Sequence, residues 1–460
     1  MTSYKHFGPL ALPVISFALV IVLGAILLSL PMSSVGAPVS FVNALFTATS
    51  AVCVTGLSVV DTGTTFSIVG QSIILVLIQL GGLGITTYTS LIFILWRRRV
   101  SITDRLAVGQ ALLHDTSFDL KRFLVRMVKI VFIIEASGAL LLMLLGQGDG
   151  QMGMGMDWYA AIFHSVSAFC NAGFSLFSSN LMDFQENLGV NAVIMFLIVV
   201  GGLGFSVIDE GINLGKAMVR RRKHKGLSRY ASLVISTSIF LVVGGTAVFW
   251  TIEVSRGHSH MSGLDFALPA LFQAISARTA GFNTIDFGLI SDAGLLILIF
   301  LMFIGGSSGS CAGGIKTSTF RVLCGFVSAQ FKGHDQIILH GRAVDIHARN
   351  KALTLFIFSV LAIVIGVTIL TITTDVEQLG AAKGLDRHFT FMDMFFETVS
   401  AFATVGLSTG LTPHLDLSGK LCITCLMFIG RLGPMWLLTT LQSLQSEPKY
   451  RWPETDMPIG

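Results

Sequence analysis

Apolar residues in this chain are gathered into long runs that come in four pairs. Each pair encloses a shorter apolar stretch and then a segment of small residues and glycine, so one order of features is repeated four times. Long runs of this kind suit helices that cross a bilayer, which takes about 20 apolar residues. The pattern therefore predicts an all-α integral membrane protein with eight transmembrane helices. The paired runs are 9–31 with 66–96, 123–146 with 188–218, 229–254 with 291–327, and 350–373 with 418–444.

The shorter apolar stretches lie within each pair, at 41–52, 158–170, 265–277 and 389–402. They are too short to cross a bilayer as helices, so we interpret them as re-entrant half-helices. Internal periodicity of this length defines the architecture, and it predicts four helix–pore loop–helix repeats around a pseudo-fourfold pore. The repeats are residues 1–99, 100–225, 226–330, and 331–460, the last of which includes the C-terminal tail.

A glycine segment follows each half-helix. The copies run from Ser50 to Ser58, Ser167 to Ser175, Ser276 to Asn283, and Ser400 to Ser408. Non-helical backbone is tolerated in a membrane only where it is buried in protein or lines a wet cavity. Glycine reaches backbone angles that other residues avoid, so four copies can turn carbonyl oxygens toward a dehydrated cation. Close helix packing through small residues is the alternative explanation for any one copy.

We therefore predict an ion-selectivity filter for a dehydrated cation, which the resemblance described below implies to be potassium, and no other metal or cofactor held by this chain. The predicted filter residues are Val54, Thr55 and Gly56 in repeat 1, Asn171, Ala172 and Gly173 in repeat 2, Thr279, Ala280 and Gly281 in repeat 3, and Thr404, Val405 and Gly406 in repeat 4.

A second glycine motif follows the first after 25, 28, 24 and 24 residues in the four repeats. In repeat 3 it extends over 305–314, where five of the ten residues are glycine and three are serine. Each interior glycine costs a helix about 1 kcal/mol relative to alanine, so a break is expected there. Such a break at this depth is either a movable plug or a static interruption needed for packing. The predicted gate residues are Gly305, Gly306, Ser307, Ser308, Gly309, Ser310, Cys311, Ala312, Gly313, Gly314 and, in repeat 4, Arg431.

Arg431 stands where the other three repeats have glycine in the second motif. A charged residue inside a membrane costs at least ~2.5–3.5 kcal/mol and requires partners. We expect these to be carbonyls of the 305–314 segment, with cavity water as the alternative. Arg278, beside the third filter segment, is expected to pair with a carboxylate, with contact to permeating ions as the alternative. Asp61, outside the first filter segment, either concentrates cations at the mouth or is an ordinary loop acid.

The distribution of charged residues predicts how the chain is oriented in the membrane. Hydrophobic residues make up 53% of the chain and charged residues only 12%, which excludes an ordinary soluble protein. Basic residues gather in the connections at 97–126, 216–229 and 328–351. The positive-inside rule therefore places these connections and both termini in the cytoplasm. The net charge of +4 comes from these anchoring clusters, and we predict no nucleic-acid partner.

With these motifs, the chain resembles the Trk/Ktr/HKT superfamily of potassium transporters over roughly residues 10–445. The resemblance rests on the four repeats, the segment from Arg278 to Thr284 and the loop from Gly305 to Lys316. The chain starts directly at the first repeat and is nearest to the Ktr-type membrane subunits. One filter glycine per repeat is implied, and none is replaced by serine, the change associated with sodium permeation in some plant relatives. Cys311 stands where threonine is commoner.

The resemblance implies potassium uptake across the cytoplasmic membrane of a bacterium, with an intramembrane loop as gate. It further implies a homodimer in the lipid bilayer that docks a cytosolic ring of nucleotide-binding RCK subunits. Transport coupled to sodium or to protons, as in a symporter, and channel-like transport are both compatible with the sequence.

Two other functions use motifs that this sequence also contains. A serine protease would use the Gly-x-Ser-x-Gly pattern at Gly305 to Gly309, but such a serine needs a histidine base within hydrogen-bond reach. Among the histidines only His164 lies in an apolar segment, so no enzyme is predicted. An alternating-access secondary cation transporter also uses broken helices at the midplane. Such folds usually show two repeats, whereas this chain shows four copies, so the ion-conducting subunit is preferred.

Overall fold

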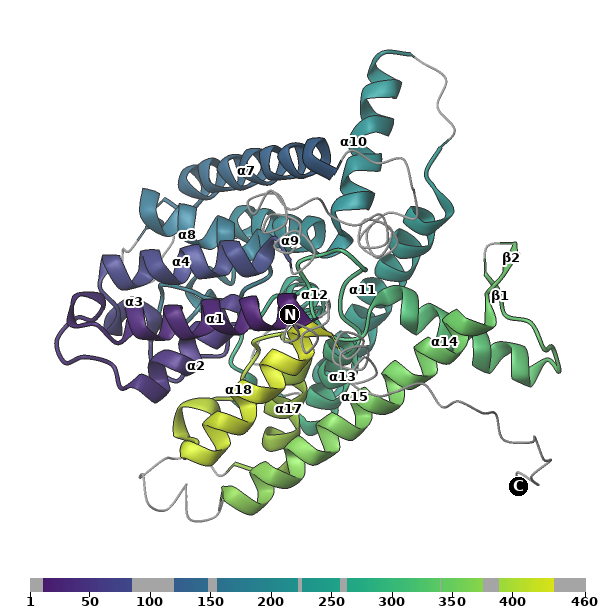
Figure 1. The fold of residues 1–460 in the computed structure, drawn as a ribbon. Helices are drawn as coiled ribbons and strands as arrows, with labels where there is room; N and C mark the ends of the chain where they lie inside the picture. Colours follow the sequence, from purple (N-terminus) through teal and green to yellow (C-terminus); the bar gives the residue numbers. More distant parts are fainter. Residues whose placement is uncertain are drawn as a thin grey trace, which may run out of the picture.

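The protein is mostly helical, as the sequence predicts. The computed structural model describes residues 11–84, 120–147, 155–221, 226–256, 263–339, 341–374 and 389–433. Each repeat supplies a first helix, a short helix and a second helix (Figure 1). In chain order these are α1 (Ala11–Leu28), α2 (Phe41–Val52) and α4 (Ile68–Gly82); α7 (Leu120–Leu145), α8 (Trp158–Phe169) and α9 (Leu188–Leu203); α11 (Arg229–Arg256), α12 (Ala267–Ser276) and α13 (Asp292–Phe303); and α15 (Ile346–Thr373), α17 (Phe391–Phe402) and α18 (Leu417–Leu432). The short helices α2, α8, α12 and α17 occupy the stretches expected to be half-helices.

Polar residues fix where the second helices begin. A side-chain oxygen at each N-cap accepts a hydrogen bond from a backbone N–H of the first turn, which satisfies a donor that has no partner within the helix. The capping residues of α4, α9, α13 and α18 are Ser67, Asn187, Ser291 and Asp416. The apolar runs are therefore bounded by the same device in all four repeats.

The helices pack in a cyclic order. Within each repeat, the first, short and second helices all contact one another. Between repeats, the second helix contacts the short helix of the next one: α4 with α8, α9 with α12, α13 with α17, and α18 with α2. The last contact joins repeat 4 back to repeat 1. The contacts between the four repeats therefore close into a ring.

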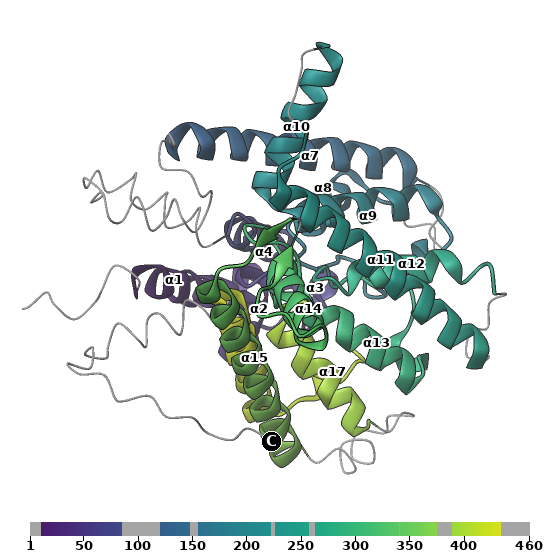
Figure 2. The ribbon, with the colours of Figure 1, turned by 90° about the vertical axis from the view of Figure 1, so that its right-hand side faces the viewer.

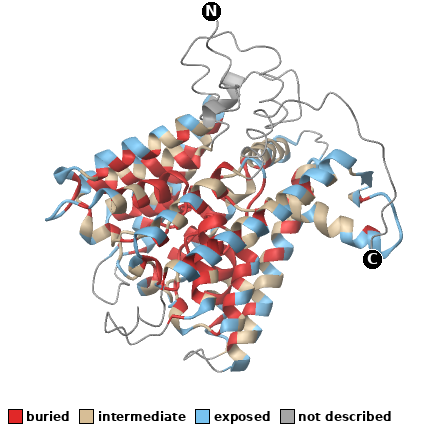
Figure 3. Cartoon of the chain, turned by 60° about the horizontal axis from the view of Figure 1, so that its bottom comes forward, coloured by how far each residue is buried: buried red, intermediate tan, exposed pale blue. Residues whose placement is uncertain are grey.

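The outer surface is apolar in the manner of a membrane protein. Three helical segments in the described ranges are long and apolar enough to cross a bilayer: Val125–Leu145, Arg229–Arg256 and Ile346–Thr373. Large apolar side chains such as Ile133 and Phe240 are 68% and 70% exposed on them. Buried residues are concentrated where the helices face one another (Figure 3). In water such a surface would be unusual, whereas lipid covers it without cost.

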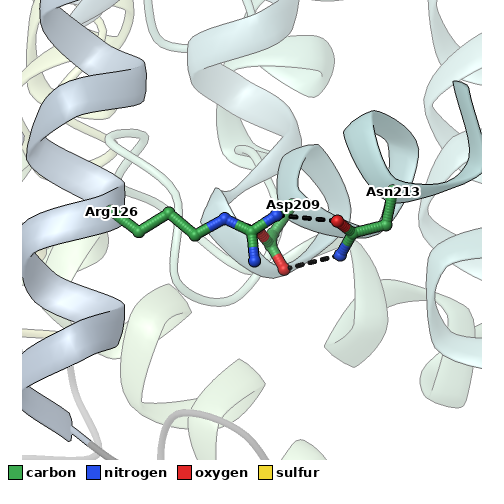
Figure 4. Close-up of polar contacts among 3 residues, drawn as sticks. All are labelled: Arg126, Asp209 and Asn213. Carbon is green, nitrogen blue, oxygen red and sulfur yellow. Dashed lines mark hydrogen bonds and ion pairs between the residues drawn. The ribbon is translucent and has the colours of Figure 1, made fainter. Parts of the chain in front are cut away.

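The second helix of repeat 2 differs from its prediction. The run 188–218 was expected to be one spanning helix, but the chain bends by 108° between α9 and α10 (Phe205–Val219). The bend lies at Gly204, whose φ of +87° is in the region that favours glycine. Helix α10 projects away from the other helices (Figure 2). Arg126 of α7 holds it through Asp209 (3.0 Å) and Asn213 (2.7 Å), as Figure 4 shows.

The second helix of repeat 3 is also interrupted, as the sequence predicts. Helix α13 ends at Phe303 and α14 (Thr317–Phe331) begins after an irregular segment that contains 305–314. In repeats 1 and 4 the predicted runs 66–96 and 418–444 continue outside the described residues. A two-stranded hairpin of β1 (Ile338–Leu339) and β2 (Arg342–Ala343) follows α14. Single turns complete the fold: α3 (Thr62–Thr65), η1 (Pro31–Ser33), η2 (Met182–Phe184), η3 (Phe287–Leu289) and η4 (Thr412–His414).

Candidate functional site

The four glycine segments share one backbone conformation. The glycines all have positive φ, and so do the residues two positions earlier. The residues at these earlier positions are not glycine, and a positive φ is sterically unfavourable for them. The φ values are +56° and +96° at Val54 and Gly56, +58° and +69° at Asn171 and Gly173, +74° and +79° at Thr279 and Gly281, and +51° and +94° at Thr404 and Gly406. Positive φ is uncommon for β-branched residues. Its recurrence in three of the four segments therefore marks a backbone held in place by its surroundings.

The four glycines also lie against one another, and we call Gly56, Gly173, Gly281 and Gly406 the glycine ring. A Cβ atom added to Gly173 would lie 2.8 Å from the Ala280 oxygen and 2.9 Å from the Gly281 Cα. Corresponding contacts run from Gly56 to repeat 2, from Gly281 to repeat 4 and from Gly406 to repeat 1. Glycine is therefore required twice, for its dihedral angles and for the close approach of backbone from the neighbouring repeat.

Serine side chains hold each segment in this conformation. Ser50 Oγ donates to the Leu57 oxygen (2.7 Å) and accepts from the Gly56 N–H (3.1 Å). The other three serines donate in the same way to the residue after the ring glycine: Ser167 to Phe174, Ser276 to Phe282 and Ser400 to Leu407. No role was predicted for these serines, although a serine is the first residue of every copy of the motif. Their repetition was the signal that could have found them.

Buried polar side chains brace the chain beyond the ring. Glu397 of α17 accepts hydrogen bonds from Ser408 Oγ (2.5 Å), the Thr409 N–H (3.1 Å) and Thr412 Oγ1 (2.6 Å). In repeat 2, His164 Nε2 lies 2.9 Å from Ser175 Oγ. None of these four contacts was anticipated. An acid or a histidine inside an apolar helix carries no sign, in sequence alone, of what it will bond.

A hollow lies beside the ring. Its volume is about 280 Å³, and Gly56, Gly173, Asp61 and Asn180 are among the residues that line it. The Asp61 carboxylate accepts from the N–H groups of Gly63 (2.8 Å) and Thr64 (3.1 Å). Asp61 therefore caps α3 and lines this hollow at the same time. Its carboxylate contributes negative charge near the ring.

The second glycine motif serves close packing in three repeats. A Cβ atom at Gly81, Gly201 or Gly430 would overlap the last carbonyl oxygen of the short helix, at Val52, Phe169 or Phe402 respectively. The second helix therefore rests directly on the end of the short helix that carries the ring segment. In repeat 3 the equivalent Gly305 instead faces the Gly313 oxygen. The 305–314 loop thus occupies the place that helix packing fills elsewhere.

The 305–314 loop is tied to the end of α9. The Ser307 N–H donates to the Gly202 oxygen (3.1 Å), and the Cys311 N–H donates to the Gly201 oxygen (3.3 Å). In return, the Phe205 N–H of α10 donates to the Gly309 oxygen (3.2 Å). The loop therefore fills the space beside the bend between α9 and α10. The same glycine motif that continues into α10 supplies the carbonyls that hold the loop.

Arg431 reaches both the loop and repeat 1. Its Nη1 donates to the Cys311 oxygen, and its Nη2 donates to the Gly81 oxygen (2.5 Å). The side chain is buried, with 8% of its surface exposed. Arg278 does not pair with a carboxylate in the described part of the chain, contrary to expectation, and its Nη2 donates to the Gly305 oxygen (3.3 Å). The loop carbonyls took the place of the expected acid because the loop backbone is irregular and leaves them free.

Comparison with known proteins assigns the architecture to a family. A family model described as TrkH, cation transport protein, matches residues 12–449. The Ktr system potassium uptake protein B of Bacillus subtilis (strain 168) is 36% identical over 464 residues, which cover 100% of this chain and 98% of that protein. The potassium/sodium uptake protein NtpJ of Enterococcus hirae is 34% identical, with 99% of this chain and 98% of that protein covered.

The fold agrees with a solved structure. The crystal structure of the potassium transporter TrkH from Vibrio parahaemolyticus superposes with a TM-score of 0.71, at 18% identity, over 95% of this chain and 86% of that one. These matches confirm the resemblance on which the sequence analysis relied.

Proposed function

Because the chain belongs to the TrkH family of cation transport proteins, we propose that it takes up potassium ions through the glycine ring. The observation that carries this proposal is the cyclic contact of four backbone segments, one from each repeat. Relatives named for potassium uptake cover nearly the whole chain. In this proposal the ion passes along the main chain of these four segments.

In the proposed filter, carbonyl oxygens replace the water around a dehydrated ion. Residues with positive φ at alternate positions, such as Val54 and Gly56, turn successive carbonyl groups toward the ion. The hydrogen bonds from the serines hold the backbone in this conformation. The filter comprises the three predicted residues of each repeat, within eight membrane-spanning segments arranged as four helix–pore loop–helix units. The hollow next to Asp61 is the proposed entrance, where its charge raises the local cation concentration.

We further propose that the 305–314 loop is the gate. It lies next to the filter residues, because Gly313 packs against Thr404 and Ala403. It is bonded to the end of α9 and to the first residue of α10, so a movement of α10 would act directly on it. Arg431 is proposed to hold the closed loop, because its guanidinium bonds a loop carbonyl.

The surroundings of the subunit follow from charge and family. The basic connections are proposed to lie in the cytoplasm, with both termini, in the inner membrane of a bacterium. Pairing into a homodimer and docking of a nucleotide-binding ring on this face are proposed from the Ktr-type resemblance. One relative is named for both potassium and sodium, so sodium is included as a second proposed ion.

Potassium-limited growth of an uptake-deficient bacterium tests the function. Expression of the chain with a ring protein of the Ktr type should restore growth at low potassium, and a Gly281→Ser variant should not. Matched membrane levels of both proteins are the control. Equal growth of the variant and the wild type would contradict the role of the ring, and no growth of either would contradict potassium uptake.

A further inference from the structure

A cavity of about 340 Å³ lies between α9 of repeat 2 and α11 of repeat 3. One stripe of α11 lines it, made of residues at helical spacing: Ile235, Ser238, Ile239, Val242 and Val243. Residues three and four apart share a helix face, so this stripe is one continuous wall. The inner end of the cavity is formed by Arg278 and Gly306.

The cavity opens toward the surface that faces lipid. Ile239 and Val243 are 58% and 61% exposed, and Val199 on the opposite wall is 38% exposed. Two small residues, Ser238 and Gly202, are among those that line the cavity. The opening is therefore lateral, from the hydrocarbon of the bilayer toward the start of the loop.

Arg278 is the one charged residue of this apolar lining. Its Nη2 donates to the Gly305 oxygen (3.3 Å), but its Nε is buried and has no partner among the described residues. A buried polar atom without a partner costs about 1–3 kcal/mol, and more when the group is charged. The guanidinium therefore brings positive charge to the lining of an otherwise apolar cavity.

We propose that the cavity binds a long-chain carboxylate of the fatty-acid type. The chain would lie between α9 and α11 and the carboxylate would meet Arg278, since arginine pairs with carboxylates through parallel N–H bonds. The volume falls in the range of ligand sites, about 300–1,000 Å³. The site shares Arg278 with the Gly305 carbonyl, so its occupant contacts the first residues of the loop.

Depth distinguishes a free fatty acid from a phospholipid. Helix α13 has 12 residues before the break near Gly305, which is a length of about 18 Å. Arg278 bonds the Gly305 oxygen just beyond the end of α13. With α13 starting at the membrane surface, Arg278 lies near the middle of a hydrocarbon core about 30 Å thick. A phospholipid keeps its phosphate at the interface, whereas a single-chain acid can enter whole.

Photolabelling of the purified full chain in proteoliposomes tests this site. The probe is a palmitic acid analogue with a photoactivatable group in the chain, and its methyl ester serves as the uncharged match. We expect the acid to label peptides of α9 and α11, and to do so roughly tenfold more than the ester, since a charge-assisted bond is lost. Arg278→Gln should abolish the preference for the acid.

Two substitutions on α11 complete the test without changing Arg278. Ser238→Phe fills the cavity and should remove the labelling. Phe240→Trp is the control, because Phe240 is 70% exposed and lies outside the lining stripe. Labelling spread evenly over the lipid-facing helices, equal labelling by acid and ester, or labelling that persists in Ser238→Phe would each overturn the proposal. None of these measurements depends on ion transport, so they test the lipid site independently of the proposed potassium uptake.

Discussion

At the residue scale, glycine serves two different purposes in each repeat. Gly173 has a φ of +69° and touches backbone of the next repeat. Gly201 is an ordinary helical residue, but a Cβ atom there would overlap the Phe169 oxygen. The first purpose concerns the path of the ion, and the second concerns how tightly the second helix rests on the short one. Substitution of the first glycine should therefore change ion transport, and substitution of the second should lower the stability of the fold.

Gly56→Ser and Gly281→Ser test the first purpose. An added side chain distorts the carbonyl ring, so we expect weaker potassium uptake and a higher ratio of sodium to potassium transport. Gly410→Ser is the matched control, because Gly410 also has positive φ (+93°) but an added Cβ meets nothing within 4 Å. Ion fluxes in vesicles measure the ratio. Unchanged apparent affinities for both ions in the two ring variants would show that these positions are not the filter.

Gly201→Ala tests the second purpose. The methyl group collides with main chain that cannot move far, and overpacking of this kind costs about 1–3 kcal/mol. We expect a lower melting temperature in detergent. Gly215→Ala on α10 is the control, because an added Cβ there is in open space and alanine favours helix. Equal melting temperatures for Gly201→Ala and wild type would contradict the close contact.

The short motifs show what sequence can and cannot supply at this scale. Repetition located the ring residues, because four copies of one pattern are visible without any structure. The partner of Arg278 was predicted wrongly, since a buried arginine is more often matched with an acid than with a carbonyl of an irregular loop. Glu397 was overlooked for a related reason. Its three donors come from residues 408–412, and only the fold brings them to it.

At the scale of elements, two interruptions with similar glycine motifs behave differently. The break at 305–314 was predictable, because half of its residues are glycine. The bend at Gly204 was not, because Gly201-Gly202-Leu203-Gly204 lies within one apolar run. The bend also depends on tertiary contacts, among them the bond from the Phe205 N–H to Gly309. Local composition indicates where a helix can break, and the neighbouring loop determines that it does.

The loop and Arg431 should act on one closed state. Deletion of 307–313 should raise potassium flux without a regulator, and Arg431→Ala should raise it in part, because only one bond to the loop is lost. The double variant should resemble the deletion, since groups that share contacts are not additive. Flux per inserted protein in vesicles is the measurement. A folded deletion variant with wild-type or lower flux would mean that the loop is a static break.

At the scale of the whole molecule, the order of helix contacts could be predicted only in outline. Four repeats suggest a fourfold arrangement, but the sequence does not state which helix of one repeat meets which helix of the next. The structure shows that each second helix meets the following short helix. Shape and packing of individual side chains decide this pairing, and no periodicity encodes them.

Assembly gives a prediction at the same scale. If the basic connections dock a ring of regulatory subunits, the ring protein should co-purify with a dimer of this chain at low salt. Higher salt should weaken the complex, because exposed charges are screened beyond about 10 Å at 0.1 M. Light scattering after size-exclusion chromatography measures the mass. A monomer that shows full regulated activity in liposomes would contradict both the dimer and the ring.

The cyclic order of the helices has one junction unlike the others. Chain continuity links consecutive repeats, whereas among the described residues repeat 4 meets repeat 1 through non-covalent contacts. Two cations bridge this junction: Lys420 Nζ donates to Asn43 Oδ1 (3.0 Å), and Arg431 Nη2 donates to the Gly81 oxygen (2.5 Å). The ring of repeats is therefore closed by non-covalent contacts between repeats 4 and 1 and not by a peptide bond. Because the Arg431 guanidinium bonds both Gly81 of repeat 1 and Cys311 of the loop, a displacement of repeat 1 from repeat 4 acts on a side chain that also holds the loop.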